Sequence, residues 1–128
     1  MRADGRELAA VFAGGFAGAI ARAALAEALP HDPGAWPWAT LLVNIAGALV
    51  LGYVITRVED GREPFEHAGR LLGTGFCAAL TTFSALQLEL LQMLDEARYG
   101  LAAGYALVSV AAGLLAVVLT ARLAHGAR

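Results

Sequence analysis

Four long apolar blocks follow one another along the chain, separated by short polar connections. The blocks run from about residue 8 to 29, 38 to 56, 70 to 94 and 99 to 122. Each is long enough to cross a bilayer, which takes about 20 helical residues. Because backbone polar groups in lipid must bond within their own segment, such blocks form helices. The pattern therefore predicts one all-α membrane domain over residues 1–128, with four transmembrane helices surrounded by lipid.

The centre of the third block is unusually polar. It reads GTGFCAALTTFSALQLELL over residues 73–91 and places Thr81, Thr82 and Ser84 within an apolar run. Neighbouring Thr and Ser hydroxyls can bond the backbone and so permit a break in a helix. Broken helices at membrane depth usually line an ion site, with carbonyl ends favouring cations and free N–H groups favouring anions. We therefore expect a break in the third helix.

Other polar side chains at membrane depth leave two interpretations open, because each needs a partner or water. Asn44, early in the second block, can bond another helix or line an ion path with its amide donors. Tyr105 and Ser109 are one helical turn apart, so they form either a ladder of hydroxyl donors or a contact between helices. Arg22 lies deep in the first block and can extend to the membrane surface.

Small residues four positions apart recur in three of the blocks, and this spacing lets helix backbones approach closely. The pairs are Gly14 with Gly18, Ala48 with Gly52, and Gly100 with Gly104. Four helices of this length make a thin bundle, so we expect a second subunit to complete any transport path.

Composition excludes several other classes of protein. The chain is 59% hydrophobic and 16% charged, and all nine of its basic residues are arginines scattered singly. This distribution does not form a basic face for nucleic acid. The single Cys77 excludes an internal disulfide. The sequence contains no nucleophile–base pair or metal cluster, so we expect no enzymatic activity.

The arginines are also distributed unequally between the two sides of the membrane. Four spans put both termini and the 57–70 connection on one side, with the other two connections opposite. The terminal side carries seven arginines, which are Arg2, Arg6, Arg57, Arg62, Arg70, Arg122 and Arg128. The other side carries Arg98, and Arg22 if it extends that way. Because positive residues in short loops stay cytoplasmic, we expect a protein of the cell membrane with both termini in the cytoplasm.

Three segments resemble the signature segments of the CrcB/Fluc family of fluoride-specific ion channels. They are GGFAGAIAR at 14–22, TLLVNIAGALVLG at 40–52 and GFCAALTTFSALQLE at 75–89, and the resemblance covers essentially the whole chain. It implies an antiparallel dimer of four-helix subunits with two narrow pores that export fluoride passively and so lower its toxicity. It also implies a structural sodium ion, which is not transported, held by backbone carbonyls at the break.

The resemblance also implies roles for individual residues. Ala78 and Thr81 match the positions of the sodium carbonyls, and Arg22, with Gly14 and Gly18, matches the first segment as a structural element. The positive edge of an aromatic ring at Phe83 can face an anion. The residues implied along the fluoride path are Asn44, Thr82, Phe83, Ser84, Glu89, Tyr105 and Ser109.

The chain also departs from the family pattern. Ala78 and Ala79 replace paired glycines, Leu86 replaces the second pore phenylalanine, Gln87 replaces a serine, and Gly113 replaces a residue that is often polar. These departures keep open a second interpretation, a non-conducting or half-pore partner subunit of a heterodimeric channel. Since seven arginines against two disfavour insertion in both orientations, we expect a dimer with an oppositely oriented paralogue.

A small multidrug exporter is a further alternative, because that class is also built from four-helix antiparallel dimers. It needs a carboxylate at the centre of the first helix to exchange protons for a cationic drug. The first block offers only Glu27, near its end. The sequence therefore favours the channel over the exporter.

Overall fold

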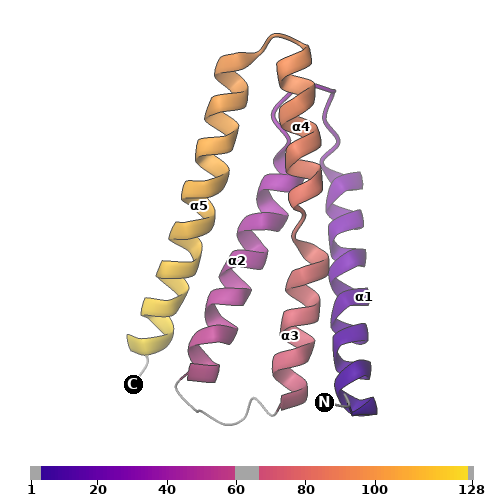
Figure 1. Ribbon diagram of the computed structural model, residues 1–128, viewed down its shortest axis with the longest axis vertical. Coiled ribbons are helices and arrows are strands. Elements are labelled where there is room, and N and C mark those ends of the chain that lie inside the picture. The colour runs from indigo at the N-terminus through magenta and orange to yellow at the C-terminus, as the bar shows by residue number, and fades with distance from the viewer. Residues whose placement is uncertain (1–3, 60–66, 127–128) are drawn as a thin grey trace.

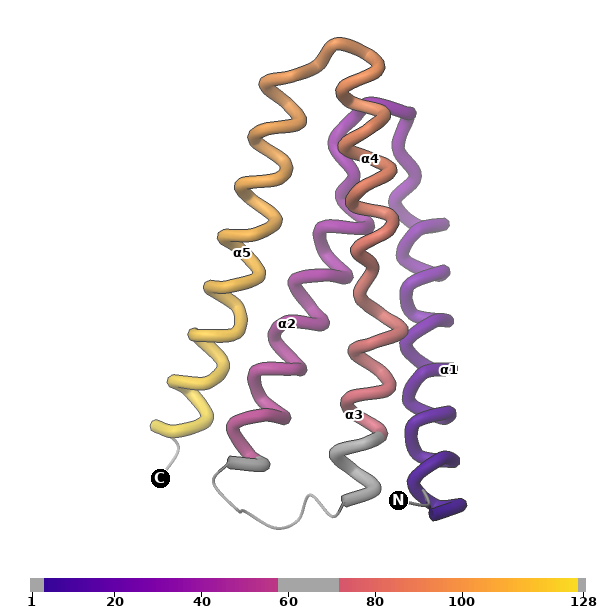
Figure 2. Tube along the Cα trace, in the orientation of Figure 1, coloured from indigo at the N-terminus to yellow at the C-terminus, as the bar shows by residue number. Residues whose placement is uncertain are grey.

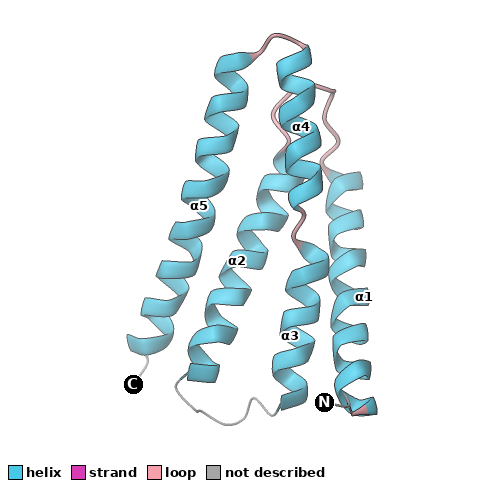
Figure 3. Cartoon of the chain, viewed as in Figure 1, coloured by secondary structure: helices cyan, strands magenta, loops and turns pink. Residues whose placement is uncertain are grey.

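The computed structural model describes residues 4–59 and 67–126, and within these ranges every element is a helix (Figures 1 and 3). In chain order the helices are α1 (Gly5–Ala28), α2 (Trp38–Glu59), α3 (His67–Leu80), α4 (Phe83–Asp95) and α5 (Tyr99–Gly126). Four segments are long and apolar enough to cross a membrane: α1, α2, α5, and the stretch Leu72–Asp95 formed by α3 and α4 together. The prediction of an all-α, multi-pass membrane protein with four spans is confirmed.

The spans stand side by side and alternate in direction (Figures 1 and 2). Both ends of the chain lie at one end of the bundle, where α2 also ends and α3 begins. The 29–37 loop and the 96–98 turn lie at the opposite end. Helix α1 packs chiefly on α3, α2 packs chiefly on α5, and α4 continues the line of α3.

Helix α1 approaches α3 so closely that backbone meets backbone. A Cβ atom added at Gly14 would lie 2.0 Å from the carbonyl oxygen of Leu72, and one added at Gly18 would lie 2.3 Å from that of Phe76. No side chain fits at either position. Such contacts are typical of glycines in membrane helices, where close packing rather than the hydrophobic effect holds helices together.

The other small-residue pairs behave differently from one another. Gly52 of α2 meets α5, because a Cβ there would lie 3.0 Å from the carbonyl oxygen of Val117. At Gly100 and Gly104 no described atom outside the local helix lies within 4 Å of an added Cβ. Within the described chain this pair therefore meets no other helix.

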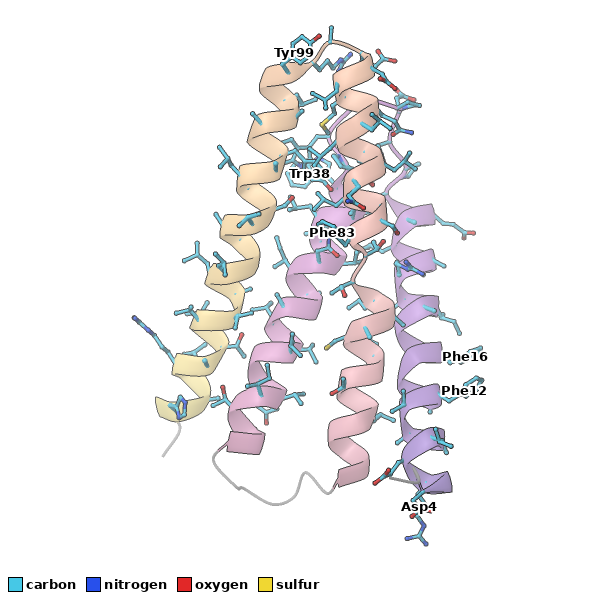
Figure 4. All side chains as sticks on the ribbon, viewed as in Figure 1. Asp4, Phe12, Phe16, Trp38, Phe83 and Tyr99 are labelled. Carbon is cyan, nitrogen blue, oxygen red and sulfur yellow. The ribbon has the colours of Figure 1, made fainter. Side chains whose placement is uncertain are left out.

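The interior is small, and much of the apolar surface points outward. A buried cluster of Leu41, Met93, Ala102 and Tyr105 joins α2, α4 and α5 near the 96–98 turn. By contrast, Phe12 of α1 is 75% exposed and points away from the bundle (Figure 4). A soluble domain of this size rarely leaves so large an apolar surface uncovered, whereas lipid covers it in a membrane protein.

Candidate functional site

The third span is interrupted near its middle. Helix α3 ends at Leu80, α4 begins at Phe83, and the chain is not helical at Thr81 and Thr82. Thr82 is extended, with φ −147° and ψ 111°, and its Oγ1 accepts a hydrogen bond from the N–H of Ala85 at 3.2 Å. Thr82 is therefore the N-cap of α4, a position that threonine favours because its hydroxyl satisfies a free helical N–H.

Asn44 of α2 bonds the backbone at this interruption. The N–H of Thr82 donates to Asn44 Oδ1 at 2.8 Å, and Asn44 Nδ2 donates to the carbonyl of Thr82 at 3.3 Å. Of the two interpretations of Asn44, the structure shows the contact with another span, made through these two hydrogen bonds. The second hydrogen of Nδ2 has no partner among the described residues, so a donor for a ligand remains.

Two carbonyls, those of Ala78 in α3 and of Thr81 just after it, lack their usual helical partners at the interruption. In a continuous helix the N–H of Thr82 would bond the Ala78 carbonyl, and the N–H of Ala85 would bond the Thr81 carbonyl. Here the first N–H turns to Asn44 and the second to the Thr82 hydroxyl. Both carbonyl oxygens are thereby left without a helical donor.

A second polar cluster is centred on Glu89, which is only 7% exposed. Thr40 Oγ1 of α2 donates to Glu89 Oε1, and the Tyr105 hydroxyl of α5 donates to Oε2 at 2.7 Å. The carboxylate thus joins three spans, and Tyr105 is completely buried. Thr40 was missed by the sequence reasoning, although it lies one helical turn before Asn44 and therefore on the same face of α2.

The remaining residues expected on the ion path lie around these two clusters. Ser84 Oγ is 3.3 Å from the Thr82 hydroxyl. The hydroxyl oxygen of Ser109, one turn beyond Tyr105, is buried and has no hydrogen-bond partner in the described part of the chain. Phe83 is 70% exposed, and Figure 4 shows it near the middle of the bundle's height. An exposed ring at this depth faces either lipid or a partner.

Two hollows flank the interruption. The first, of about 340 Å³, lies between α1, α2 and α4, and its polar lining comes from Arg22, His31, Thr40, Thr82 and Glu89. The second, of about 300 Å³, lies between α2, α3 and α5 and is lined in part by Asn44, Ala78 and Thr81. The bonded pair Asn44 and Thr82 thus contributes one residue to each hollow. His31 was also missed, because nothing in the sequence of the 29–37 loop indicates which helix it meets.

The donor set around the hollows limits the ions that can bind there. The described residues contain no group of three or more His, Cys, Asp or Glu side chains that could hold a metal. A cation near α3 would therefore be bound by backbone carbonyls, which suit a hard monovalent ion. An anion would meet hydroxyl and amide donors from Asn44, Thr82 and Ser84.

Comparison with known proteins finds relatives over nearly the whole chain. Residues 9–121 match the family described as "CrcB-like protein, Camphor Resistance (CrcB)". A protein of Mycolicibacterium paratuberculosis named "Fluoride-specific ion channel FluC 1" is 54% identical over 98% of this chain and 95% of its own length. A protein of the same name from Mycobacterium bovis is 49% identical over the same shares.

More distant relatives carry related names. "Fluoride-specific ion channel FluC" of Bordetella avium is 37% identical over 91% of this chain and 90% of its own. A match to residues 9–121, with relatives of this identity and coverage, settles the family. The chain belongs to the CrcB-like protein family.

Proposed function

We propose that the chain is one subunit of a dimeric, fluoride-specific channel of the cell membrane. The observation that carries the proposal is its 54% identity, over 98% of the chain, to a protein named as a fluoride-specific ion channel. The site agrees in chemistry, because it combines neutral donors and an aromatic edge with backbone carbonyls. A multidrug exporter is not favoured, because α1 has no carboxylate between Glu7 and Glu27.

Passage of fluoride depends on replacing its water with donors that do not hold it permanently. The free N–H of Asn44 and the hydroxyls of Thr82 and Ser84 are neutral donors at the interruption. Phe83 beside them presents ring edges, which are weakly positive, and enough bulk to keep the path narrow for larger anions such as chloride. These groups bind the ion weakly and in succession, which passive conduction requires.

Glu89 controls two further donors. The carboxylate and a fluoride ion are both acceptors, so they compete for the hydroxyls of Thr40 and Tyr105. An ion passing at this level accepts a hydrogen bond that one of these hydroxyls otherwise donates to the carboxylate. The hydroxyl bonds the carboxylate again when the ion leaves. The hydroxyl of Ser109, one turn further along α5 and without a partner among the described residues, supplies the next donor.

A second subunit completes the path. Phe83 and the bare glycines Gly100 and Gly104 leave surface that a partner covers, and the second hollow opens beside the interruption. The carbonyls of Ala78 and Thr81 fit the structural sodium ion of the family, because both lack a helical donor. A sodium ion bound by these two carbonyls would supply a fixed positive charge beside the interrupted span. Neither alanine nor threonine side chains take part, so Ala78 in place of glycine leaves the donor set unchanged.

The partner is expected to be an oppositely oriented paralogue, with both termini of this chain in the cytoplasm. Seven arginines lie at the terminal side against at most two at the other, a strong bias for one orientation. Leu86 packs against the buried cluster that includes Leu41, Met93 and Tyr105 and offers no ring. A half-pore subunit, in which the partner supplies the missing ring, is therefore the second candidate function.

Growth of a bacterial strain that lacks its own fluoride exporter tests both versions. The chain alone, or together with a paralogue, is expected to restore growth in fluoride, whereas an empty vector does not. Restoration only in the presence of the paralogue identifies the half-pore subunit. Failure of both combinations, with the protein present in the membrane, contradicts the proposed function.

A further inference from the structure

A histidine from the 29–37 loop reaches the buried carboxylate of the first hollow. His31 Nε2 lies 3.9 Å from Glu89 Oε1, and the His31 side chain is 25% exposed against 8% for Glu89. His31 therefore lines this hollow beside the carboxylate that accepts hydrogen bonds from Thr40 and Tyr105. Fluoride-binding chemistry does not by itself require a histidine at this place.

The charge of the hollow depends on this side chain. Arg22 and Glu89 are the other charged residues of its lining, and their unit charges cancel. Helix α2 contributes the neutral Thr40 to the lining, and the Tyr105 hydroxyl of α5 donates to the Glu89 carboxylate. The remaining ionisable residues at this end of the described chain are mostly acidic, namely Glu27, Asp32, Asp95, Glu96 and Arg98. An anion approaching the hollow therefore meets a less repulsive field when His31 is protonated than when it is neutral.

We propose that His31 sets the charge of this hollow and makes the access of fluoride depend on pH. The inference rests on the proposed channel function. An imidazole gains its proton between about pH 8 and pH 5. A protonated His31 would pair with Glu89 Oε1 and leave the lining of the hollow with one net positive charge. A positive charge there raises the local concentration of an anion.

The same protonation also changes the hydrogen bonds. Glu89 Oε1 accepts the hydroxyl of Thr40, and a protonated imidazole is a stronger donor to that oxygen. The Thr40 hydroxyl then becomes available to an ion in the hollow. Both effects have the same sign, so fluoride flux rises as the pH falls. One unit charge at about 10 Å changes anion occupancy by roughly two- to tenfold, depending on the local dielectric.

Fluoride efflux from liposomes at about pH 7.5 and pH 5.5, with equal pH on both sides and fluoride below saturation, tests the proposal. The chain is reconstituted alone or with the paralogue that it needs, and protein-free liposomes measure the leak of undissociated acid at each pH. The wild type should conduct fluoride roughly two- to tenfold faster at the lower pH. His31→Gln should conduct slowly at both, and His31→Arg should conduct fast at both.

His125→Gln is the matched control, because it removes a histidine from the last turn of α5 at the opposite end of the bundle. It should keep the pH dependence of the wild type. Equal yield and elution volume on size-exclusion chromatography show that the His31 variants are folded. If His31→Arg does not fold, His31→Gln alone decides.

Two results would overturn the inference, and they differ in what else they remove. If His31→Gln conducts with the same pH dependence as the wild type, His31 is not the titrating group, and the channel function stands. If the wild type gives no fluoride efflux at either pH, alone or with the paralogue, the proposed function fails and the inference fails with it.

Discussion

Replacing Asn44 with leucine tests whether α2 holds the interrupted span. The substitution removes both hydrogen bonds to the backbone of Thr82 and keeps a side chain of similar size. The N–H of Thr82 then has no acceptor unless α3 extends to its own Ala78 carbonyl. Such an extension would displace the interruption, so either outcome destabilises the native arrangement.

The magnitude follows from the two distances. The bond from the Thr82 N–H is 2.8 Å long and well within the ordinary range, whereas the bond from Asn44 Nδ2 is long at 3.3 Å. A hydrogen bond between membrane helices contributes about 0.6 kcal/mol on average and about 1.7 kcal/mol at most. Leaving a buried donor without a partner costs about 1–3 kcal/mol. We expect Asn44→Leu to lower the free energy of unfolding by about 1–3 kcal/mol.

Unfolding by sodium dodecyl sulfate in a mild detergent measures this change. Tryptophan fluorescence, which comes from Trp36 and Trp38, reports it, because the Trp36 ring packs edge-on against that of Tyr105, with centroids 5.3 Å apart. Thr120→Val is the control. Its hydroxyl donates to the Ala116 carbonyl, which is already inside a helix, so no buried donor is left and the loss should stay below about 0.5 kcal/mol.

Hydrogen exchange of the peptide that covers residues 80–84 locates the effect. The Thr82 amide should exchange faster in Asn44→Leu than in the wild type, because its acceptor is gone. The reasoning is refuted if Asn44→Leu unfolds at the same detergent concentration as the wild type and its Thr82 amide is equally protected.

Three further predictions concern the path, the helix packing and the orientation. Phe83→Ile should lower fluoride efflux about two- to tenfold with a normal protein yield. The control Phe12→Ile, which replaces a similarly exposed ring on α1, should leave efflux unchanged, and equal effects of the two variants would show that Phe83 does not line the path. Gly18→Ala should lower the free energy of unfolding by about 1–3 kcal/mol, because the added Cβ would lie 2.3 Å from a backbone oxygen. The control Gly5→Ala should have little effect, because a Cβ there meets nothing within 4 Å, and similar unfolding curves for the two variants would contradict this packing. Carboxy-terminal reporters should be active only inside the cell, and comparable activity outside would argue against a fixed orientation and a paralogous partner.

The spans could be predicted from sequence because each is a local property. About 20 apolar residues in succession suffice to indicate a membrane helix, and the structure has the four blocks at nearly the predicted residues. The polar stretch around Thr81 and Thr82 could likewise be located, because hydroxyls compete for nearby backbone groups within a few residues.

Contacts between distant segments could not be predicted in the same way. Thr40, Glu89 and Tyr105 meet only through the relative rotation of three helices, and His31 joins them from a loop. The spacing of Gly100 and Gly104 puts both on one face of α5, but says nothing about what lies opposite. For Asn44, too, the sequence indicated an amide that donates and accepts hydrogen bonds, but it did not indicate that the partner is the backbone of Thr82.

Efflux of fluoride and chloride from liposomes loaded with equal concentrations of both ions, followed by two ion-selective electrodes, tests the central claim most directly. Valinomycin with potassium carries the compensating charge, and protein-free liposomes give the background. The account predicts fast fluoride efflux with chloride at background, from the chain alone or with its paralogue. Equal efflux of the two ions, or fluoride at background in both preparations, would contradict it.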